Sequence, residues 1–211
     1  MKIKAVLFDI DGVLLDSFYA VYVFYRNLLE HYGYRKPTKK EVSKTFHMTM
    51  WDMIKILSKE ESEEKIGKLW SKGQRFDLYP IELLKMPKDL KKTIKELDKN
   101  YKLGLVTGRT KKGVGIFFLV SKLRKYFQVV VCYESYKKPK PHPESLLIAL
   151  KRLKVKPEEA VYIGDSWADA LAAKRAKIKF ISYERKVKGA DYNINKLVDL
   201  IKVIKWIEQK N

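Results

Sequence analysis

Short apolar runs alternate along most of the chain with segments of helical periodicity. Each run is bounded by charged or turn-forming residues, as expected of a strand that is buried on both faces. Strands that alternate with helices predict an α/β fold, in which a parallel sheet is covered by helices on both sides. The predicted strands are Ala5–Phe8, Leu103–Val106, Val129–Cys132, Ala160–Ile163 and Ile178–Ile181.

One region, residues 17–84, breaks this alternation because it contains no convincing strand. Its aromatic-rich segments have helical spacing, with a turn near Phe46–Thr49, and the α/β pattern resumes after Met86-Pro87. We therefore expect an α/β core made of residues 1–16 and 85–211, with a helical subdomain, residues 17–84, inserted after the first strand. The expected helices are Phe18–Tyr32, Lys39–Leu57 and Glu60–Leu78 in the insert, and Leu146–Leu153 and Lys196–Gln209 in the core.

The length of 211 residues, 46% of them hydrophobic, allows one sizeable core and a smaller subdomain. Cys132 is the single cysteine, which excludes an internal disulfide and favours a reduced, intracellular setting. No apolar run is long enough for a signal-peptide core or a membrane span. We expect a cytoplasmic protein, with no membrane partner, that is a monomer or a homodimer.

The formal net charge is 45 − 25 = +20, which could attract nucleic acid, an anionic membrane or small anionic substrates. The lysines are spread along the chain, often beside glutamate, and asparagine and glutamine are sparse. Such a composition is typical of thermophilic proteins. Dedicated nucleic-acid binding is therefore disfavoured.

Acidic residues follow two of the predicted strands. Asp9 and Asp11 come directly after the first, and Asp165 and Asp169 follow Ala160–Ile163. Taken alone, the first pair could be a solvated Asp-Gly turn, and Asp169 could simply complement a helix dipole. If the two strands are neighbours, however, up to four carboxylates converge, and such a cluster is relieved by a hard divalent cation. Oxygen ligands alone favour Mg²⁺.

Candidate groups for binding an anion follow other strands. The Thr107 hydroxyl and the backbone N–H of Gly108 could hold a phosphate oxygen, although Thr107 could equally cap the next helix. Lys140 offers a positive charge within the proline-rich segment Lys137–Pro143. Taken alone, that segment could be an exposed basic loop.

Taken in order, these residues resemble the four motifs of the haloacid dehalogenase superfamily. Asp9–Ser17 resembles the first motif in its phosphatase form, and Thr107-Gly108 resembles the second. Lys140–Pro143 resembles the third, and Gly164–Asp169 the fourth. The resemblance covers nearly the whole chain and is nearest to the branch of phosphoglycolate phosphatase and β-phosphoglucomutase. It implies a Rossmann-like core with a helical cap inserted after the first strand, which fits residues 17–84.

The match has one ambiguity and two departures. Lys138 could replace Lys140 in the third motif, and we choose Lys140 because its distance from Ala149 matches the family spacing. Lys177 stands where many members have glycine, at a turn. Arg109 stands where many members carry lysine or a small residue.

The resemblance implies a mechanism in which Asp9 attacks phosphorus and forms an aspartyl phosphate. Asp11 would protonate the leaving oxygen and then deprotonate water. Mg²⁺ would be held by Asp9, the backbone carbonyl of Asp11 and Asp165, while Asp169 would either ligate it or orient Lys140. The transferred phosphate would bind to Asp9, Gly12, Thr107, Gly108 and Lys140. The implied partner is a small phosphorylated metabolite.

Other activities share this fold. Haloacid dehalogenases proper lack a carboxylate at the position of Asp11, whereas a phosphomutase would use the same four motifs. A basic scaffold that binds nucleic acid is the non-enzymatic alternative. Within the insert, His47 and Thr49 are candidates for substrate contacts, because related caps reach the active site from a similar turn; packing is the competing interpretation there.

Overall fold

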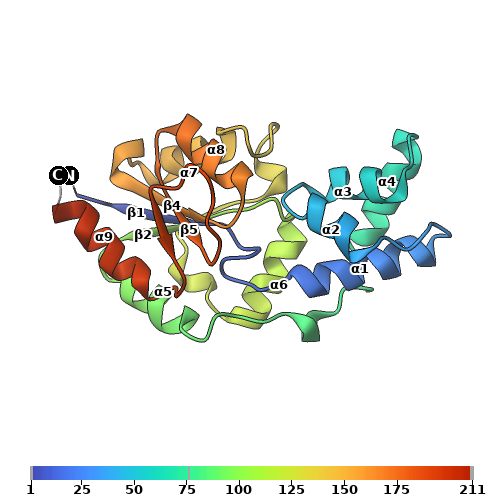
Figure 1. Cartoon of the computed structure of the whole chain (residues 1–211), viewed down its shortest axis with the longest axis horizontal. Helices are drawn as coiled ribbons and strands as arrows, with labels where there is room; N and C mark the ends of the chain where they lie inside the picture. Colours follow the sequence, from blue (N-terminus) through green and yellow to red (C-terminus); the bar gives the residue numbers. More distant parts are fainter. Residues whose placement is uncertain (1, 76, 210–211) are drawn as a thin grey trace.

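The computed structural model describes residues 2–75 and 77–209. Its centre is a parallel sheet with the strand order β3-β2-β1-β4-β5-β6 (Figure 1). The predicted α/β class with a parallel sheet is therefore confirmed. The strands are β1 (Ala5–Phe8), β2 (Lys102–Val106), β3 (Val129–Val131), β4 (Ala160–Gly164), β5 (Lys179–Tyr183) and β6 (Tyr192–Ile194).

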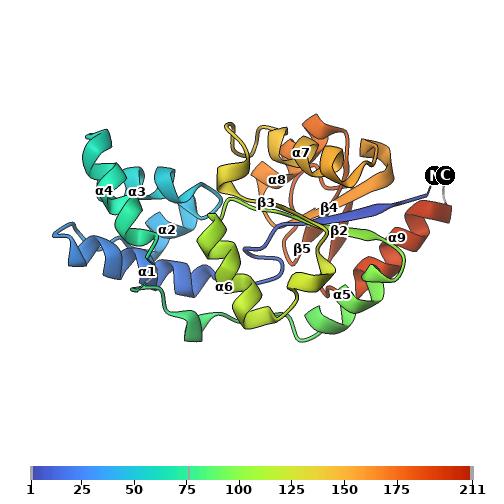
Figure 2. The ribbon, with the colours of Figure 1, turned by 180° about the vertical axis from the view of Figure 1, so that it is seen from behind.

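Helices cover both faces of this sheet (Figures 1 and 2). On one face α5 (Leu90–Asp98), α6 (Lys111–Ser121) and α9 (Asp199–Gln209) pack against a cluster that includes Phe8 and Phe117. On the other face α7 (Glu144–Leu153) and α8 (Trp167–Ala176) pack around Leu7 and Tyr162. Burial on both faces explains why the central strands are apolar throughout.

The strand register places the acidic motifs next to each other. Phe8, the last residue of β1, is paired with Leu105 of β2 and Ile163 of β4. Asp9 therefore lies at the end of β1, between the segment after β2 that contains Thr107 and the segment after β4 that contains Asp165. Both β2 and β4 flank β1, so the condition under which the acidic strand ends would converge, that their strands are neighbours, is met.

The helices of the insert lie beyond the carboxyl ends of the strands (Figure 1). They share a separate hydrophobic cluster built around Phe24, Leu28, Ile54 and Leu69, to which Ile116 of α6 also contributes. Amphipathic helices of this length are stabilised mainly by such packing. The helices are α1 (Phe18–His31), α2 (Lys39–Thr45), α3 (Met50–Ser58) and α4 (Glu63–Gly73).

Several predicted boundaries were wrong. The segment predicted as helix over Lys39–Leu57 is two helices, because Thr49 caps a new helix with its side chain. The helix predicted over Glu60–Leu78 starts at Glu63, where Ser62 is the N-cap, and ends at Gly73; the prediction also spans Phe76, which lies outside the described residues. The final helix begins at Asp199 rather than Lys196.

The strand β6 was missed because only Ile194 of its three residues is buried, so it carries no apolar run. The strand predicted over Ile178–Ile181 begins one residue later and continues to Tyr183. In the described part of the chain, short 3-10 helices occupy the connections Ile81–Leu83, Arg124–Tyr126, Tyr133–Ser135 and Pro157–Glu159. Within the described residues, no helix combines the length and apolar character needed to cross a bilayer.

Candidate active site

Asp9 occupies the first position after β1 and is 8% exposed. Its backbone N–H donates to the Ile163 carbonyl at 2.9 Å, which extends the pairing with β4. Its Oδ1 accepts the Ile10 N–H at 2.7 Å, and its Oδ2 accepts the Lys140 ammonium at 2.9 Å. These bonds fix the carboxylate at the end of the sheet, where parallel sheets bind ligands.

Gly12 lies against the Asp165 carboxylate. A Cβ on Gly12 would stand 2.1 Å from Asp165 Oδ2, and the positive φ of 72° at this position also favours glycine. Its N–H donates to the Leu15 carbonyl at 2.8 Å. The role of Gly12 that the contacts support is therefore to leave room for Asp165; phosphate binding by Gly12 remains a prediction.

Lys140 is held by three oxygen atoms. Its Nζ donates to Asp9 Oδ2 at 2.9 Å, to Asp169 Oδ1 at 2.6 Å and to the Tyr162 hydroxyl at 3.0 Å. Burial opposes the charge on the ammonium, but the carboxylates of Asp169 and Asp9 outweigh it and raise the pKa of Lys140 well above its usual value. Lys138, the alternative in this segment, is exposed.

The Asp169 carboxylate has its lone pairs occupied by protein groups. Oδ1 accepts from Lys140 and from the Tyr162 hydroxyl at 2.7 Å, and Oδ2 accepts from the Ser166 hydroxyl and N–H. Burial would raise the pKa of Asp169, but Lys140 and these hydrogen bonds hold it below its usual value. Of the two roles left open for Asp169, this arrangement favours orientation of Lys140 over metal ligation.

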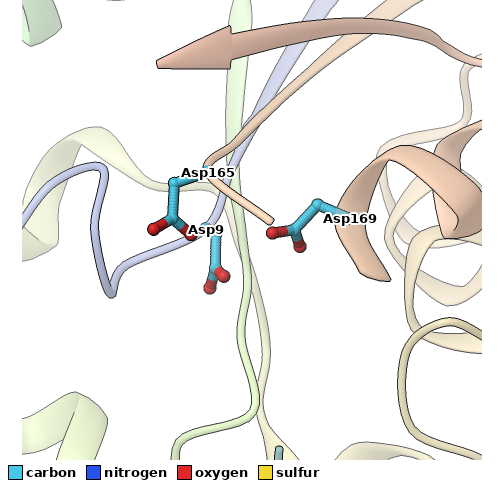
Figure 3. Close-up of side chains that lie close together, drawn as sticks. All are labelled: Asp9, Asp165 and Asp169. Atoms are coloured by element: carbon cyan, nitrogen blue, oxygen red, sulfur yellow. The ribbon is translucent and has the colours of Figure 1, made fainter. Parts of the chain in front are cut away.

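Asp9, Asp165 and Asp169 nevertheless form one buried acidic cluster (Figure 3). One carboxylate oxygen from each lies within 4.8 Å of the others. Burial, together with repulsion from the neighbouring carboxylates, raises the pKa of both Asp9 and Asp165 to about 7. A divalent cation would relieve this repulsion and keep both groups ionised, so the donor set fits Mg²⁺ with Asp9 and Asp165 as the side-chain ligands.

The Asp11 carboxylate is not part of that cluster, because Arg109 holds it. Arg109 Nε donates to Asp11 Oδ2 at 2.8 Å, and Nη2 donates to Oδ1 at 2.6 Å. The Ser17 hydroxyl also donates to Oδ1. Burial would raise the pKa of Asp11, but the guanidinium and these hydrogen bonds keep it below its usual value.

Thr107 and Gly108 follow β2 and border the same region. Thr107 is 1% exposed, and its Oγ1 accepts the Arg109 N–H at 3.2 Å, so its hydroxyl hydrogen is available to donate. Thr110, rather than Thr107, caps α6 by accepting the Gly113 N–H. The competing interpretation of Thr107 as the cap of that helix is therefore wrong.

A polar cavity of about 330 Å³ opens over Asp9 and Lys140. The core side of its wall includes Asp165 and Gly108, and the opposite side comes from the end of α2 and the turn that follows it. Two exposed basic side chains, Lys44 and Arg185, also line it and add positive charge, and the exposed indole of Trp167 lies beside them in the wall. A cavity of this size accommodates a small anionic molecule.

The two candidates from the insert have different surroundings. His47 lines the polar cavity and packs edge to face on Trp167, with ring centroids 5.3 Å apart. Burial lowers the pKa of His47. The Thr49 hydroxyl donates to Asp52 Oδ2 at 2.7 Å and accepts the Asp52 N–H, so capping of α3 accounts for it. A substrate contact remains a prediction for both, and the geometry favours His47.

Three residues near the site were missed by sequence reasoning. Tyr162 lies within an apolar run, where a tyrosine is ordinarily a packing residue, yet its hydroxyl joins Lys140 and Asp169. Trp167 is 53% exposed although it follows a buried strand and turn. Arg185 approaches Asp165 Oδ2 at 3.9 Å. Only Trp167 carried a usable signal, because a large aromatic residue inside an acidic motif is unusual for packing.

A family model described as haloacid dehalogenase-like hydrolase matches residues 6–183, which contain every motif residue described above. The chain belongs to this family. It is therefore a hydrolase, and the resemblance inferred from the four motifs is confirmed.

Named relatives point to the same branch. Pyrophosphatase PpaX of Bacillus mycoides (strain KBAB4) is 30% identical over 98% of this chain and 99% of its own length. Among solved structures, a Lactobacillus plantarum protein assigned as a phosphoglycolate phosphatase matches with a TM-score of 0.82 and 23% identity, over 96% of this chain and 100% of its own. β-Phosphoglucomutase of Clostridium difficile matches with a TM-score of 0.84 and 20% identity, over 99% and 98%. At these identities, the two structures show a shared fold.

Proposed function

We propose that this hydrolase is a Mg²⁺-dependent phosphatase that hydrolyses a small phosphorylated metabolite through an aspartyl phosphate. The observation that carries the proposal is the position of Asp9, which faces the polar cavity with Lys140 bonded to its Oδ2 at 2.9 Å and Asp165 beside it. The pyrophosphatase and phosphatase names of its relatives support chemistry at phosphorus.

In the first step, an Asp9 oxygen attacks phosphorus, and the bond from phosphorus to the ester oxygen breaks. Asp11 supplies the proton that the leaving oxygen takes up. Lys140 and the Thr107 hydroxyl bind the remaining phosphoryl oxygens, whose charge changes as the bond breaks. Since Lys140 already contacts Asp9, the nucleophile and its charge partner are aligned before the substrate arrives.

In the second step, a water molecule attacks phosphorus, and the bond to Asp9 breaks. Asp11 takes the proton of this water, so the carboxylic acid needed for the next cycle is restored together with free Asp9 and inorganic phosphate. The Asp11 side chain also separates this proposal from haloacid dehalogenation, which needs no acid at that position.

Asp9, Asp165 and the backbone carbonyl of Asp11 would hold Mg²⁺. When bound, the ion would neutralise charge on the phosphoryl group and on Asp9. Asp169 would act through Lys140, because its own oxygens are engaged by Lys140, Tyr162 and Ser166. We further propose that residues 17–84 form the cap that covers the substrate.

Metal removal tests this proposal directly. After dialysis against excess EDTA, hydrolysis of p-nitrophenyl phosphate should fall below about 1% of the starting rate, because the metal contributes several kcal/mol to transition-state stabilisation. Added Mg²⁺ should restore the rate, and the circular dichroism spectrum should stay unchanged throughout. Full activity in excess EDTA would count against the proposal.

His47 should influence which substrate is preferred. His47→Ala removes a side chain that lines the cavity and rests on Trp167, so relative kcat/KM values across a panel of phosphate esters should change order. The lost ring contact contributes about 0.5 kcal/mol, equivalent to a change of about 2 °C in Tm. A clearly lower Tm with an unchanged order would show that His47 is structural instead.

A further inference from the structure

Tyr162 places a hydroxyl group inside an otherwise apolar part of the core. It is the third residue of β4, where it pairs with Leu7 of β1 and Phe180 of β5. Its side chain is fully buried in the cluster formed with α7 and α8, and its ring centroid lies 6.0 Å from that of Phe180. The ring alone would satisfy this packing, and a buried hydroxyl is costly unless it is hydrogen-bonded. The hydroxyl therefore needs an explanation of its own.

The contacts of this hydroxyl give it a definite direction. Its oxygen lies 3.0 Å from Lys140 Nζ, 2.7 Å from Asp169 Oδ1 and 3.4 Å from the Val106 carbonyl oxygen. A phenol has one hydrogen to donate, and the short contact with the charged oxygen is the stronger of the two possible bonds. The hydroxyl therefore donates to Asp169, and its oxygen accepts from Lys140, since an ammonium can only donate.

The Lys140 ammonium has three N–H groups and meets three acceptors. They are Asp9 Oδ2 at 2.9 Å, Asp169 Oδ1 at 2.6 Å and the Tyr162 oxygen. The three N–H bonds keep fixed angles to one another, so two that are held determine the direction of the third. Of the three acceptors, only Asp9 forms a bond to phosphorus in the proposed reaction. Asp169 and Tyr162 are therefore the fixed points, and the remaining N–H is directed at Asp9.

Without the Tyr162 hydroxyl, this direction would be less well defined. A lysine ammonium lies at the end of a flexible four-carbon chain and can rotate its three donors. With Asp169 as the one remaining fixed acceptor, the ammonium could turn about that single bond. The Lys140 side chain is 8% exposed, so water does not readily take the place of the lost hydroxyl. The hydroxyl thus restricts a rotation that burial of the lysine alone does not prevent.

We propose that Tyr162 is a positioning residue for Lys140: its hydroxyl fixes the rotation of the ammonium and so aims one N–H at Asp9 and at the phosphoryl oxygen that binds there. Because Tyr162 is fully buried, it acts through Lys140 and does not touch the substrate. The inference rests on the proposed function, since it takes Asp9 as the residue to which the phosphoryl group is transferred.

The kinetic test uses Tyr162→Phe, which keeps the ring and removes the hydroxyl. On p-nitrophenyl phosphate at saturating Mg²⁺, kcat should fall about tenfold to fiftyfold, while KM should stay within about twofold of wild type. The loss falls on kcat because the direction of the N–H matters most for the charge that develops in the transition state. An unchanged kcat would overturn the inference.

Tyr34→Phe is the matched control. It also removes a hydroxyl that donates to a carboxylate, that of Glu60 at 2.9 Å, but it does so in the insert between α1 and α2. Its kcat and KM should both stay within about twofold of wild type.

A double-mutant cycle separates positioning from a general effect on the fold. Introduced into Lys140→Ala, the Tyr162→Phe change should lower kcat by no more than about a further twofold, because the hydroxyl then has no ammonium to aim. Equal losses in the two backgrounds would overturn the inference, since Tyr162 would then act on the fold and not through Lys140. The four proteins are compared at a temperature at which circular dichroism shows each of them to be folded.

An NMR measurement without metal or substrate separates this inference from the proposed function. In ¹⁵N-labelled protein, the Lys140 ammonium signal, identified by its loss in Lys140→Ala, should exchange its hydrogens with water about tenfold faster or more in Tyr162→Phe, because a hydrogen bond to a charged group is lost. An unchanged exchange rate would overturn the inference, even in an active phosphatase. Faster exchange in a protein that hydrolyses no phosphate ester would instead retain the positioning of Lys140 and reject the proposed function.

Discussion

Asp9→Asn is expected to lower phosphatase turnover by at least about 10⁴-fold while leaving the protein folded. The substitution keeps the shape of the side chain and an oxygen that can accept the Ile10 N–H. It removes the nucleophilic oxygen and one of the two carboxylates proposed to hold the metal. Steady-state rates on p-nitrophenyl phosphate, with and without raised Mg²⁺, measure this effect.

The fold should survive Asp9→Asn for an electrostatic reason. Burial and neighbouring carboxylates already raise the pKa of Asp9 to about 7, so its negative charge is destabilised where it stands. Lys140 retains Asp169 as a partner after the change. We expect a Tm equal to or slightly above that of wild type, measured without added metal.

Asp77→Asn provides the matched control, because it makes the same chemical change at an exposed ion pair with Arg75. Its turnover should stay within about twofold of wild type, as expected for a surface substitution. Turnover near the wild-type rate in Asp9→Asn would contradict the nucleophilic role of Asp9.

The core was predictable because a simple physical rule produces its pattern. A central parallel strand must be apolar on both faces, and a ligand-binding edge must then expose polar groups directly after it. The runs before Asp9 and Asp165 obey this rule, so sequence alone placed both carboxylates at strand ends, and the structure shows that the two strands are neighbours. The edge strand β6 escaped prediction because an edge strand is not required to be apolar on both faces.

The contacts between side chains within the site were less predictable, because they join residues that are far apart in the sequence and meet only in the folded protein. Asp11 and Arg109 are 98 positions apart and meet only through the adjacency of β1 and β2. Tyr162 has the signature of a packing residue, and its hydroxyl becomes informative only once Lys140 is placed above it. The role of Asp169 likewise depended on which oxygens its neighbours occupy.

The choice between two lysines illustrates the same limit. Lys138 and Lys140 both precede a proline, and the family spacing was the only ground for preferring Lys140. In the structure, the backbone N–H groups of Lys137 and Lys138 donate to the Glu144 carboxylate, which anchors the segment to the start of α7. That anchor leaves the Lys138 side chain exposed, while Lys140 reaches the acidic cluster.

Lys140→Ala should therefore reduce kcat/KM by about 10²- to 10³-fold, the effect expected when a preorganised charge partner of the phosphoryl group is lost. Lys138→Ala, which removes an identical but exposed ammonium two positions away, should stay within about twofold of wild type. The comparison is made on p-nitrophenyl phosphate at saturating Mg²⁺. A larger loss in Lys138→Ala would show that Lys138, and not Lys140, is the lysine of the third motif.

The thermal stability of Lys140→Ala provides an independent measure of how Lys140 interacts with the acidic cluster. Lys140 stands between Asp9 and Asp169, so its removal leaves two buried carboxylates without their cation, a change that destabilises proteins by roughly 3–5 kcal/mol. For a chain of this size that corresponds to a fall of about 10 °C in Tm without metal. Added Mg²⁺ should recover part of the Tm, because it supplies positive charge at Asp9. It should not recover the rate, because the ion cannot donate the hydrogen bonds of the ammonium.

Lys140→Arg should also stay slow, since a planar guanidinium cannot direct its donors to the three oxygens that one Nζ now reaches. Recovery of full activity in Lys140→Arg would show that only the charge matters and that its position between Asp9 and Asp169 does not.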